Sequence, residues 1–79
     1  MTSHEILETL TELLQDVLDD DDIALAPETT ARDVRGWDSL ANVRFMLAVE
    51  RRFKTKFAAA EVANLKSVGG LVQLIERRA

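Results

Sequence analysis

Apolar residues recur at helical spacing in the first part of the chain. Between residues 6 and 18 they form one stripe: Ile6, Leu7, Leu10, Leu13, Leu14, Val17 and Leu18. A stripe at positions i, i+1, i+4, i+7, i+8, i+11 and i+12 is typical of a helix with one face in a core. Thr2, followed three residues later by Glu5, is the pattern of a capping box at a helix start. The pattern therefore predicts a helix from about residue 3 to residue 18.

A connection without helical periodicity runs from residue 23 to residue 37. It follows four aspartates, residues 19–22, whose negative charge at a helix C-terminus favours termination. Pro27 prevents a continuous helix in the connection, while residues 30–34 have the length of one short turn. We interpret the aspartates as a solvated turn because they lack the Asp-x-Asp-x-Asp-Gly pattern of a calcium loop; a divalent-ion site is the alternative.

The segment Gly36-Trp37-Asp38-Ser39-Leu40 opens a second helix, which we predict over residues 39–53. Gly36 interrupts the preceding structure and Asp38 is a good N-cap. Ser39 is then the first helical residue, close to backbone N–H groups that have no partner within the helix. This end of a helix carries roughly half a positive charge and favours phosphate. Ser39 is therefore a candidate attachment site for a phosphodiester.

The second predicted helix has two separate apolar faces. At about 100° per residue, residues 45, 46, 49 and 53 share one arc, which we assign to the core. A second apolar set begins beside Ser39, and two arginines follow it around the helix: Leu40, Val43 and Leu47, then Arg44 and Arg51. One small core cannot easily bury both arcs. The second set either completes the core with the third helix or forms an exposed apolar strip, edged by charge, on which partner enzymes dock.

Two further helices are predicted after residue 57. Residues 58–64 have good helix propensity but no Ser, Thr or Asp cap, so packing must hold this short helix and we expect it to be the most mobile element. Ser67 is the predicted cap of the last helix, where apolar residues again recur at helical spacing. No strand alternation or internal repeat is present. The chain therefore predicts an all-α, four-helix bundle with a long connection between its first two helices and a short third helix.

Charge is divided unevenly along a chain whose 79 residues indicate one domain, residues 1–79. Residues 1–38 hold eleven Asp or Glu and two Arg, a net charge of −9. Residues 39–79 hold three Glu and eight Lys or Arg, a net charge of +5. The two halves either neutralise each other in the fold or steer a partner. The total of −4 argues against a nucleic-acid partner.

The chemistry available to the side chains is narrow. There is no cysteine, and therefore no disulfide, thiolate metal site or cysteine nucleophile. The one histidine, His4, lies far from Ser39 in the sequence, and the segment around Ser39 supplies no base. We therefore expect no enzyme activity and no metal site. With neither a signal-peptide pattern nor a run of about 20 apolar residues, we expect a cytoplasmic, monomeric protein that binds no membrane.

The segment at residues 36–40, with the residues that follow it, resembles the acyl carrier proteins and related phosphopantetheine-carrying domains. The following residues share the pattern: Val43, Met46, Leu47, Val49, Glu50 and Phe53. The resemblance covers nearly the whole chain. It implies that Ser39 receives 4′-phosphopantetheine from coenzyme A through a phosphopantetheinyl transferase. It also implies that Asp38 assists recognition by the transferase and that Leu40 packs near the attached arm.

The resemblance further implies a stand-alone carrier that presents acyl or aminoacyl thioesters to activating ligases or synthases. We expect the partner-binding surface to comprise Trp37, Val43, Arg44, Leu47, Glu50 and Arg51. Trp37 is either a partly buried anchor for the connection or a surface aromatic that contacts the partner or the arm.

One departure from the family pattern bears on the pathway. The second helix of the fatty-acid members usually carries several acidic residues, whereas here Glu50 is the only acid among three arginines. We therefore expect a specialised pathway rather than general fatty-acid synthesis. The alternative function is a helical interaction module that keeps the fold without the modification.

Overall fold

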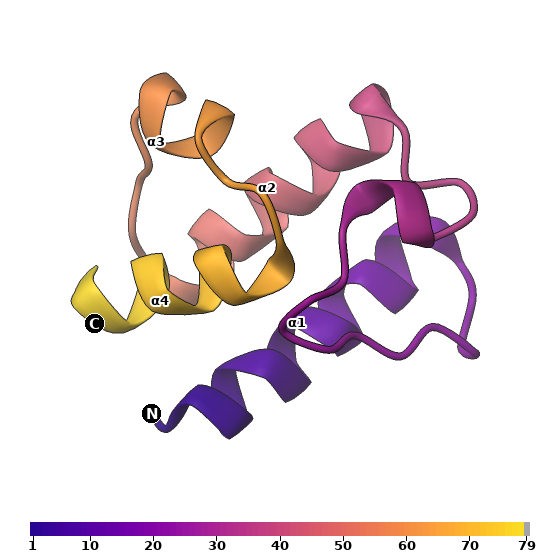
Figure 1. The fold of residues 1–79 in the computed structure, drawn as a ribbon, viewed down its shortest axis with the longest axis horizontal. Helices are drawn as coiled ribbons and strands as arrows, with labels where there is room; N and C mark the ends of the chain where they lie inside the picture. The colour runs from indigo at the N-terminus through magenta and orange to yellow at the C-terminus, as the bar shows by residue number, and fades with distance from the viewer. Residues whose placement is uncertain (79) are drawn as a thin grey trace.

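Four α-helices form most of the chain, and the computed structural model describes residues 1–78 (Figure 1). They are α1 (Ser3–Leu18), α2 (Ser39–Phe53), α3 (Ala59–Ala63) and α4 (Val68–Arg78), with a single 3-10 turn, η1 (Ala31–Asp33), in the connection between α1 and α2. Within the described range no residue is in a strand. The predicted all-α architecture, with its long connection and short third helix, is confirmed, and α1 and α2 have the predicted bounds.

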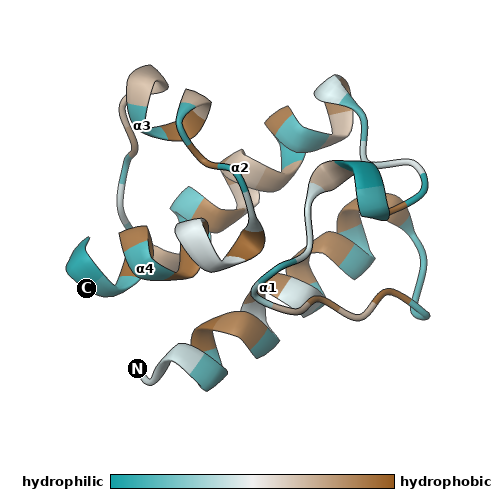
Figure 2. Cartoon of the chain, viewed as in Figure 1, coloured by the Kyte–Doolittle hydropathy of each residue, from teal (hydrophilic) through white to brown (hydrophobic). Residues whose placement is uncertain are grey.

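The core lies where α1 packs against α2 and α4. Its largest fully buried side chains come from these three helices: Ile6, Leu10, Leu14, Phe45, Val49 and Ile75. Hydrophobic residues accordingly colour the inward sides of α1 and α4 in Figure 2. Ile23 and Leu25 are also buried, so the connection is packed onto the core. This packing fixes the place at which the chain enters α2.

The two ends of α1 are set by local chemistry. Thr2 Oγ1 accepts a hydrogen bond from the Glu5 N–H (3.1 Å), and Glu5 Oε1 accepts one from the Thr2 N–H (2.8 Å). This capping box lowers the pKa of Glu5, because it favours the carboxylate form. At the other end Asp19 adopts a left-handed conformation with φ of 51°, which ends the helix. Residues 19–22 are exposed, as a solvated turn requires.

The connection is docked directly on the start of α4. The Val68 N–H donates to the Thr29 carbonyl (2.8 Å) and the Gly69 N–H donates to the Pro27 carbonyl (2.7 Å). A Cβ atom at Gly69 would lie 2.9 Å from the Pro27 oxygen, so glycine is what permits this approach. The prediction that the Ser67 side chain caps α4 is wrong, because carbonyl groups already accept the hydrogen bonds of the first N–H groups.

Helix α3 is held by polar contacts of Glu61 and by the partly buried side chain of Val62, which packs against the core. None of its residues is fully buried. Glu61 Oε1 accepts a hydrogen bond from the Ala58 N–H (2.8 Å), and the same carboxylate pairs with Arg78. These two contacts, the first being the stronger, lower the pKa of Glu61. Arg78 also donates to the Lys56 carbonyl (2.7 Å), so α4 holds both α3 and the segment before it.

Candidate functional site

Ser39 is the first residue of α2, and it is exposed. Gly36 has a φ of +87°, which turns the connection toward the helix. Asp38 then takes an extended conformation, and its Oδ1 accepts a hydrogen bond from the Ala41 N–H (2.9 Å). Its carbonyl accepts from the Asn42 N–H (2.9 Å). The predicted N-cap therefore forms, and it sets the position at which the Ser39 hydroxyl meets solvent.

Two backbone donors lie next to the Ser39 hydroxyl. Within residues 1–78 the N–H groups of Ser39 and Leu40 donate no hydrogen bond to the protein, since the Asp38 cap begins with Ala41. Unpaired N–H groups at the positive end of a helix are suited to a phosphate. The position also leaves Ser39 open to a modifying enzyme. These features fit a phosphodiester on this hydroxyl.

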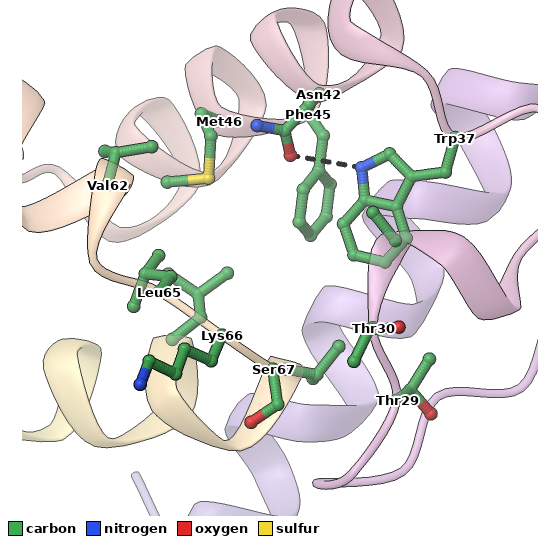
Figure 3. A pocket seen from close by; sticks show the side chains of 13 residues that line it. Thr29, Thr30, Trp37, Asn42, Phe45, Met46, Val62, Leu65, Lys66 and Ser67 are labelled. Carbon is green, nitrogen blue, oxygen red and sulfur yellow. Dashed lines mark hydrogen bonds between the residues drawn. The ribbon is translucent and has the colours of Figure 1, made fainter.

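Trp37 anchors the connection to α2. Its ring packs edge-on against Phe45, with centroids 5.4 Å apart and planes at 81°. Its Nε1–H donates to Asn42 Oδ1 (3.1 Å), as the dashed line in Figure 3 shows. Trp37 is half-buried, which agrees with the first of the two interpretations of this residue. A contact between its exposed part and a partner stays a prediction.

The outer face of α2 carries the second apolar set. Leu40 is 62% exposed, and Val43 and Leu47 are each 56% exposed. On the opposite face Phe45 is 1% exposed and Val49 is fully buried. The alternative in which the second set completes the core with the third helix is therefore wrong. Helix α3 is too short to cover this face, and none of its own residues is buried.

The charged residues of α2 are not equivalent. Arg44 and Arg51 are exposed, and neither is among the ion pairs of residues 1–78, which are His4–Glu8 and Glu61–Arg78. Glu50 is half-buried, and its Oε2 accepts a hydrogen bond from the Phe57 N–H (2.8 Å). Its carboxylate therefore stabilises the turn that follows α2. A contact between Glu50 and a partner stays a prediction.

A cavity of about 150 Å³ lies between α2, α4 and the connection (Figure 3). Trp37, Phe45 and Met46 line one side of it, and Val62 and Leu65 line another. The lining is mostly carbon, although Lys66 and Ser67 also contribute. An apolar cavity of this size can hold a small group about as large as benzene.

Few other groups offer chemistry. His4 is exposed on α1, where its Nε2 lies 3.2 Å from Glu8 Oε1. In the described part of the chain, no three His, Cys, Asp or Glu side chains converge as metal ligands would. None of the helices within residues 1–78 combines the length and the apolar character that crossing a bilayer requires.

Comparison with known proteins identifies the family. The model of the phosphopantetheine attachment site matches residues 8–75. An acyl carrier protein of Acidothermus cellulolyticus is 33% identical over 75 residues, which cover 95% of this chain and 89% of the relative. A solution NMR structure of the holo acyl carrier protein from Geobacter metallireducens superposes with a TM-score of 0.85 at 40% identity, covering 91% of this chain and 83% of that one. The chain belongs to the acyl carrier protein family.

Membership of the acyl carrier protein family gives the general function. The protein is a carrier rather than a catalyst, and it bears covalently attached 4′-phosphopantetheine. Family members interact with a phosphopantetheinyl transferase and with synthases. The resemblance read from residues 36–53 is thus confirmed at the level of the family, the fold and the cofactor.

Two residues that support the site of this carrier were missed in the sequence. Asn42 accepts the indole hydrogen bond that fixes Trp37, and Gly69 allows the connection to dock on α4. A tryptophan N–H needs an acceptor when its ring is half-buried. The polar residue Asn42, one helical turn into α2, could therefore have been predicted as the acceptor for Trp37. The role of Gly69 could not be predicted, because the sequence does not show that the Pro27 carbonyl lies against this glycine.

Proposed function

We propose that the Ser39 Oγ is the atom that bears 4′-phosphopantetheine. The observation that carries this proposal is an exposed serine hydroxyl at the N-terminus of a 15-residue helix, next to two unpaired backbone N–H groups. Ser3 also begins a helix and is exposed, but its hydroxyl donates a hydrogen bond to Glu76 Oε2 (2.8 Å). A carboxylate at that distance repels a phosphate, so of these two serines only Ser39 suits the phosphodiester.

The neighbours of Ser39 have separate roles in this proposal. Asp38 holds the helix start in place and presents its other carboxylate oxygen to the transferase. The N–H groups of Ser39 and Leu40 donate to the phosphate, and the Leu40 side chain lies beside the attached arm. The bound group supplies a thiol, which this chain lacks because it contains no cysteine. The protein contributes a site of attachment and a surface that partners recognise.

The carried group is an acyl or aminoacyl thioester of a specialised pathway. Its activating ligase or synthase docks on the exposed face of α2, with Val43 and Leu47 as the apolar contacts. The exposed arginines support a dedicated pathway, because acidic residues usually occupy this helix in carriers of fatty-acid synthesis. The cavity beneath Trp37 and Met46 suits the short aliphatic end of such a group, since its lining is mostly carbon.

The proposal is tested by loading the protein with coenzyme A and a broad-specificity phosphopantetheinyl transferase. We expect the intact mass to rise by one phosphopantetheine in the wild type and in Ser3→Ala, and not to rise in Ser39→Ala. Ser3→Ala is the matched control, because Ser3 is also exposed and also begins a helix.

An equal adduct on Ser39→Ala would overturn the assignment of the attachment site. No adduct on the wild type would instead favour the alternative, a helical interaction module that keeps the fold without the modification.

A further inference from the structure

Five residues on the outer side of α2 form one continuous surface that the fold does not use. We call this surface the basic strip; it consists of Leu40, Val43, Arg44, Leu47 and Arg51. All five are exposed, and their spacing of three or four residues places them along one side of the helix. The three apolar members are more than half exposed, and neighbouring exposed apolar side chains of this kind are typical of an interaction site.

The charge of the basic strip is entirely positive. The only acidic residue of α2, Glu50, is half-buried and accepts the Phe57 N–H, so it leaves the arginines unneutralised. Lys54 and Lys56 extend the positive surface past the end of α2. Together with Leu47, Glu50 and Arg51, these lysines line a shallow depression, in which three cationic side chains outnumber one carboxylate. The surface is therefore positive although the whole chain has a net charge of −4.

The four consecutive aspartates of the chain lie away from the basic strip, and Asp38 caps the start of α2. Asp19 to Asp22 form an exposed turn after α1, and neither Arg44 nor Arg51 is paired with a carboxylate in the described residues. Within residues 1–78 no ion pair joins the acidic half of the sequence to its basic half. Neutralisation between the halves, one of the two interpretations of the uneven charge, therefore does not apply to these two arginines. They are available to a partner.

We propose that the enzyme that docks on the basic strip presents an apolar groove edged by carboxylates. This inference rests on the proposed function, and it names the chemistry of the partner at that same surface. Leu40, Val43 and Leu47 enter the groove, while Arg44 and Arg51 meet its acidic edge. Like charges facing each other across an interface disfavour binding, so a partner with a basic rim is rejected.

Two other occupants fit the surface less well. An anionic membrane would attract the arginines, but the net charge of −4 opposes its approach, and the basic strip offers only three apolar side chains to enter the membrane. A second copy of this chain would have to place its aspartate turn against the arginines of the strip. No exposed leucine or valine is adjacent to that turn in the sequence, so it offers no apolar contact for the leucines and the valine of the strip. Both occupants become outcomes of the test.

The test uses the full chain and a pair of helix-forming peptides as probes. Both peptides carry the same leucine stripe, edged by glutamate in one and by lysine in the other. We expect the glutamate peptide to bind at least about tenfold more tightly, which corresponds to roughly 1.4 kcal/mol. In NMR titrations the largest shifts should fall on Leu40, Val43 and Leu47, and affinity should decrease with salt because the charges are exposed.

Charge reversal provides the decisive comparison. Arg44→Glu combined with Arg51→Glu should reverse the preference, so that the lysine peptide binds more tightly. Arg32→Glu combined with Arg77→Glu changes the net charge equally at exposed positions outside the strip, and should preserve the preference for the glutamate peptide.

Equal binding of the two peptides, binding of neither, or tighter binding of the lysine peptide to the wild type would overturn the proposal. Self-association without peptide that the Arg44/Arg51 reversal abolishes would also overturn it, as would tighter binding to phosphatidylserine vesicles than to the glutamate peptide. Ser39→Ala should lose the phosphopantetheine adduct but retain peptide binding. Failure of the attachment site is therefore distinguishable from failure of the partner chemistry.

Discussion

The two faces of α2 share one backbone but have opposite environments. Phe45 and Val49 face α1 and α4 and are almost completely buried. Leu40, Val43 and Leu47 lie on the other side and are more than half exposed, although they are equally apolar. Residue type alone therefore does not decide burial in this helix. The decisive factor is which side another helix covers.

This difference shows how a small carrier divides its residues between folding and recognition. The core face is buried by other helices of the same chain, so substitutions that change the volume of its side chains change the stability of the fold. The outer face gains nothing from burial in the isolated protein, so its residues can vary with the partner. Ser39 lies at the N-terminus of the same helix, where a rigid core face holds the attachment point in a fixed position.

The largest expected effect separates the two faces directly. Phe45→Ala removes a fully buried ring and should reduce the free energy of unfolding by about 3–5 kcal/mol. Leu47→Ala, on the exposed face, should change it by no more than about 0.5 kcal/mol. Urea denaturation followed by circular dichroism measures both values.

The comparison would fail if Leu47→Ala were as destabilising as Phe45→Ala, because the outer face would then contribute to folding. A chain of this size has a total stability of roughly 4–12 kcal/mol, so Phe45→Ala can unfold it. Phe45→Leu, which removes less volume, then provides a measurable loss on the same face.

A smaller effect is expected at Asp38, where both faces begin. Asp38→Ala removes the acceptor of the Ala41 N–H and should cost about 1 kcal/mol of stability. Asp38→Asn keeps an equally good N-cap and should leave stability nearly unchanged. Comparing the rates of phosphopantetheine loading of the two variants then separates the capping role from recognition by the transferase.

Loading that is slowed equally in Asp38→Ala and Asp38→Asn would assign recognition to the carboxylate charge. Loading that is normal in Asp38→Asn would show that the cap alone is required. Unchanged stability of Asp38→Ala would contradict the capping role.

The sequence predicted the parts of this fold that depend on local patterns. The bounds of α1 and α2 follow from a capping box, an Asp N-cap and the apolar spacing, and all of these act within a few residues. The same local reasoning places Ser39 at a helix start. The general function followed from the resemblance of the segment around it.

Features that depend on contacts between distant segments could not be predicted in this way. The start of α4 is capped by the carbonyls of Pro27 and Thr29, about forty residues earlier, and nothing in the sequence near Ser67 shows this. Likewise, a two-face pattern on α2 left open whether another helix covers the second face. Only the positions of α1, α3 and α4 decide that question.

The smallest expected effect concerns Glu50, which lies between the two faces. Its carboxylate accepts the Phe57 N–H, and Glu50→Gln replaces a charged acceptor with a neutral one. A hydrogen bond to a charged group is the stronger of the two, so we expect a loss of about 0.5 kcal/mol, compared with no measurable loss in the matched variant Arg51→Gln. If Glu50 instead faced a partner, Glu50→Gln would leave urea denaturation unchanged and would weaken binding of the lysine-edged peptide. That result would make Glu50 part of the recognition surface and would reduce the difference between the two faces of α2.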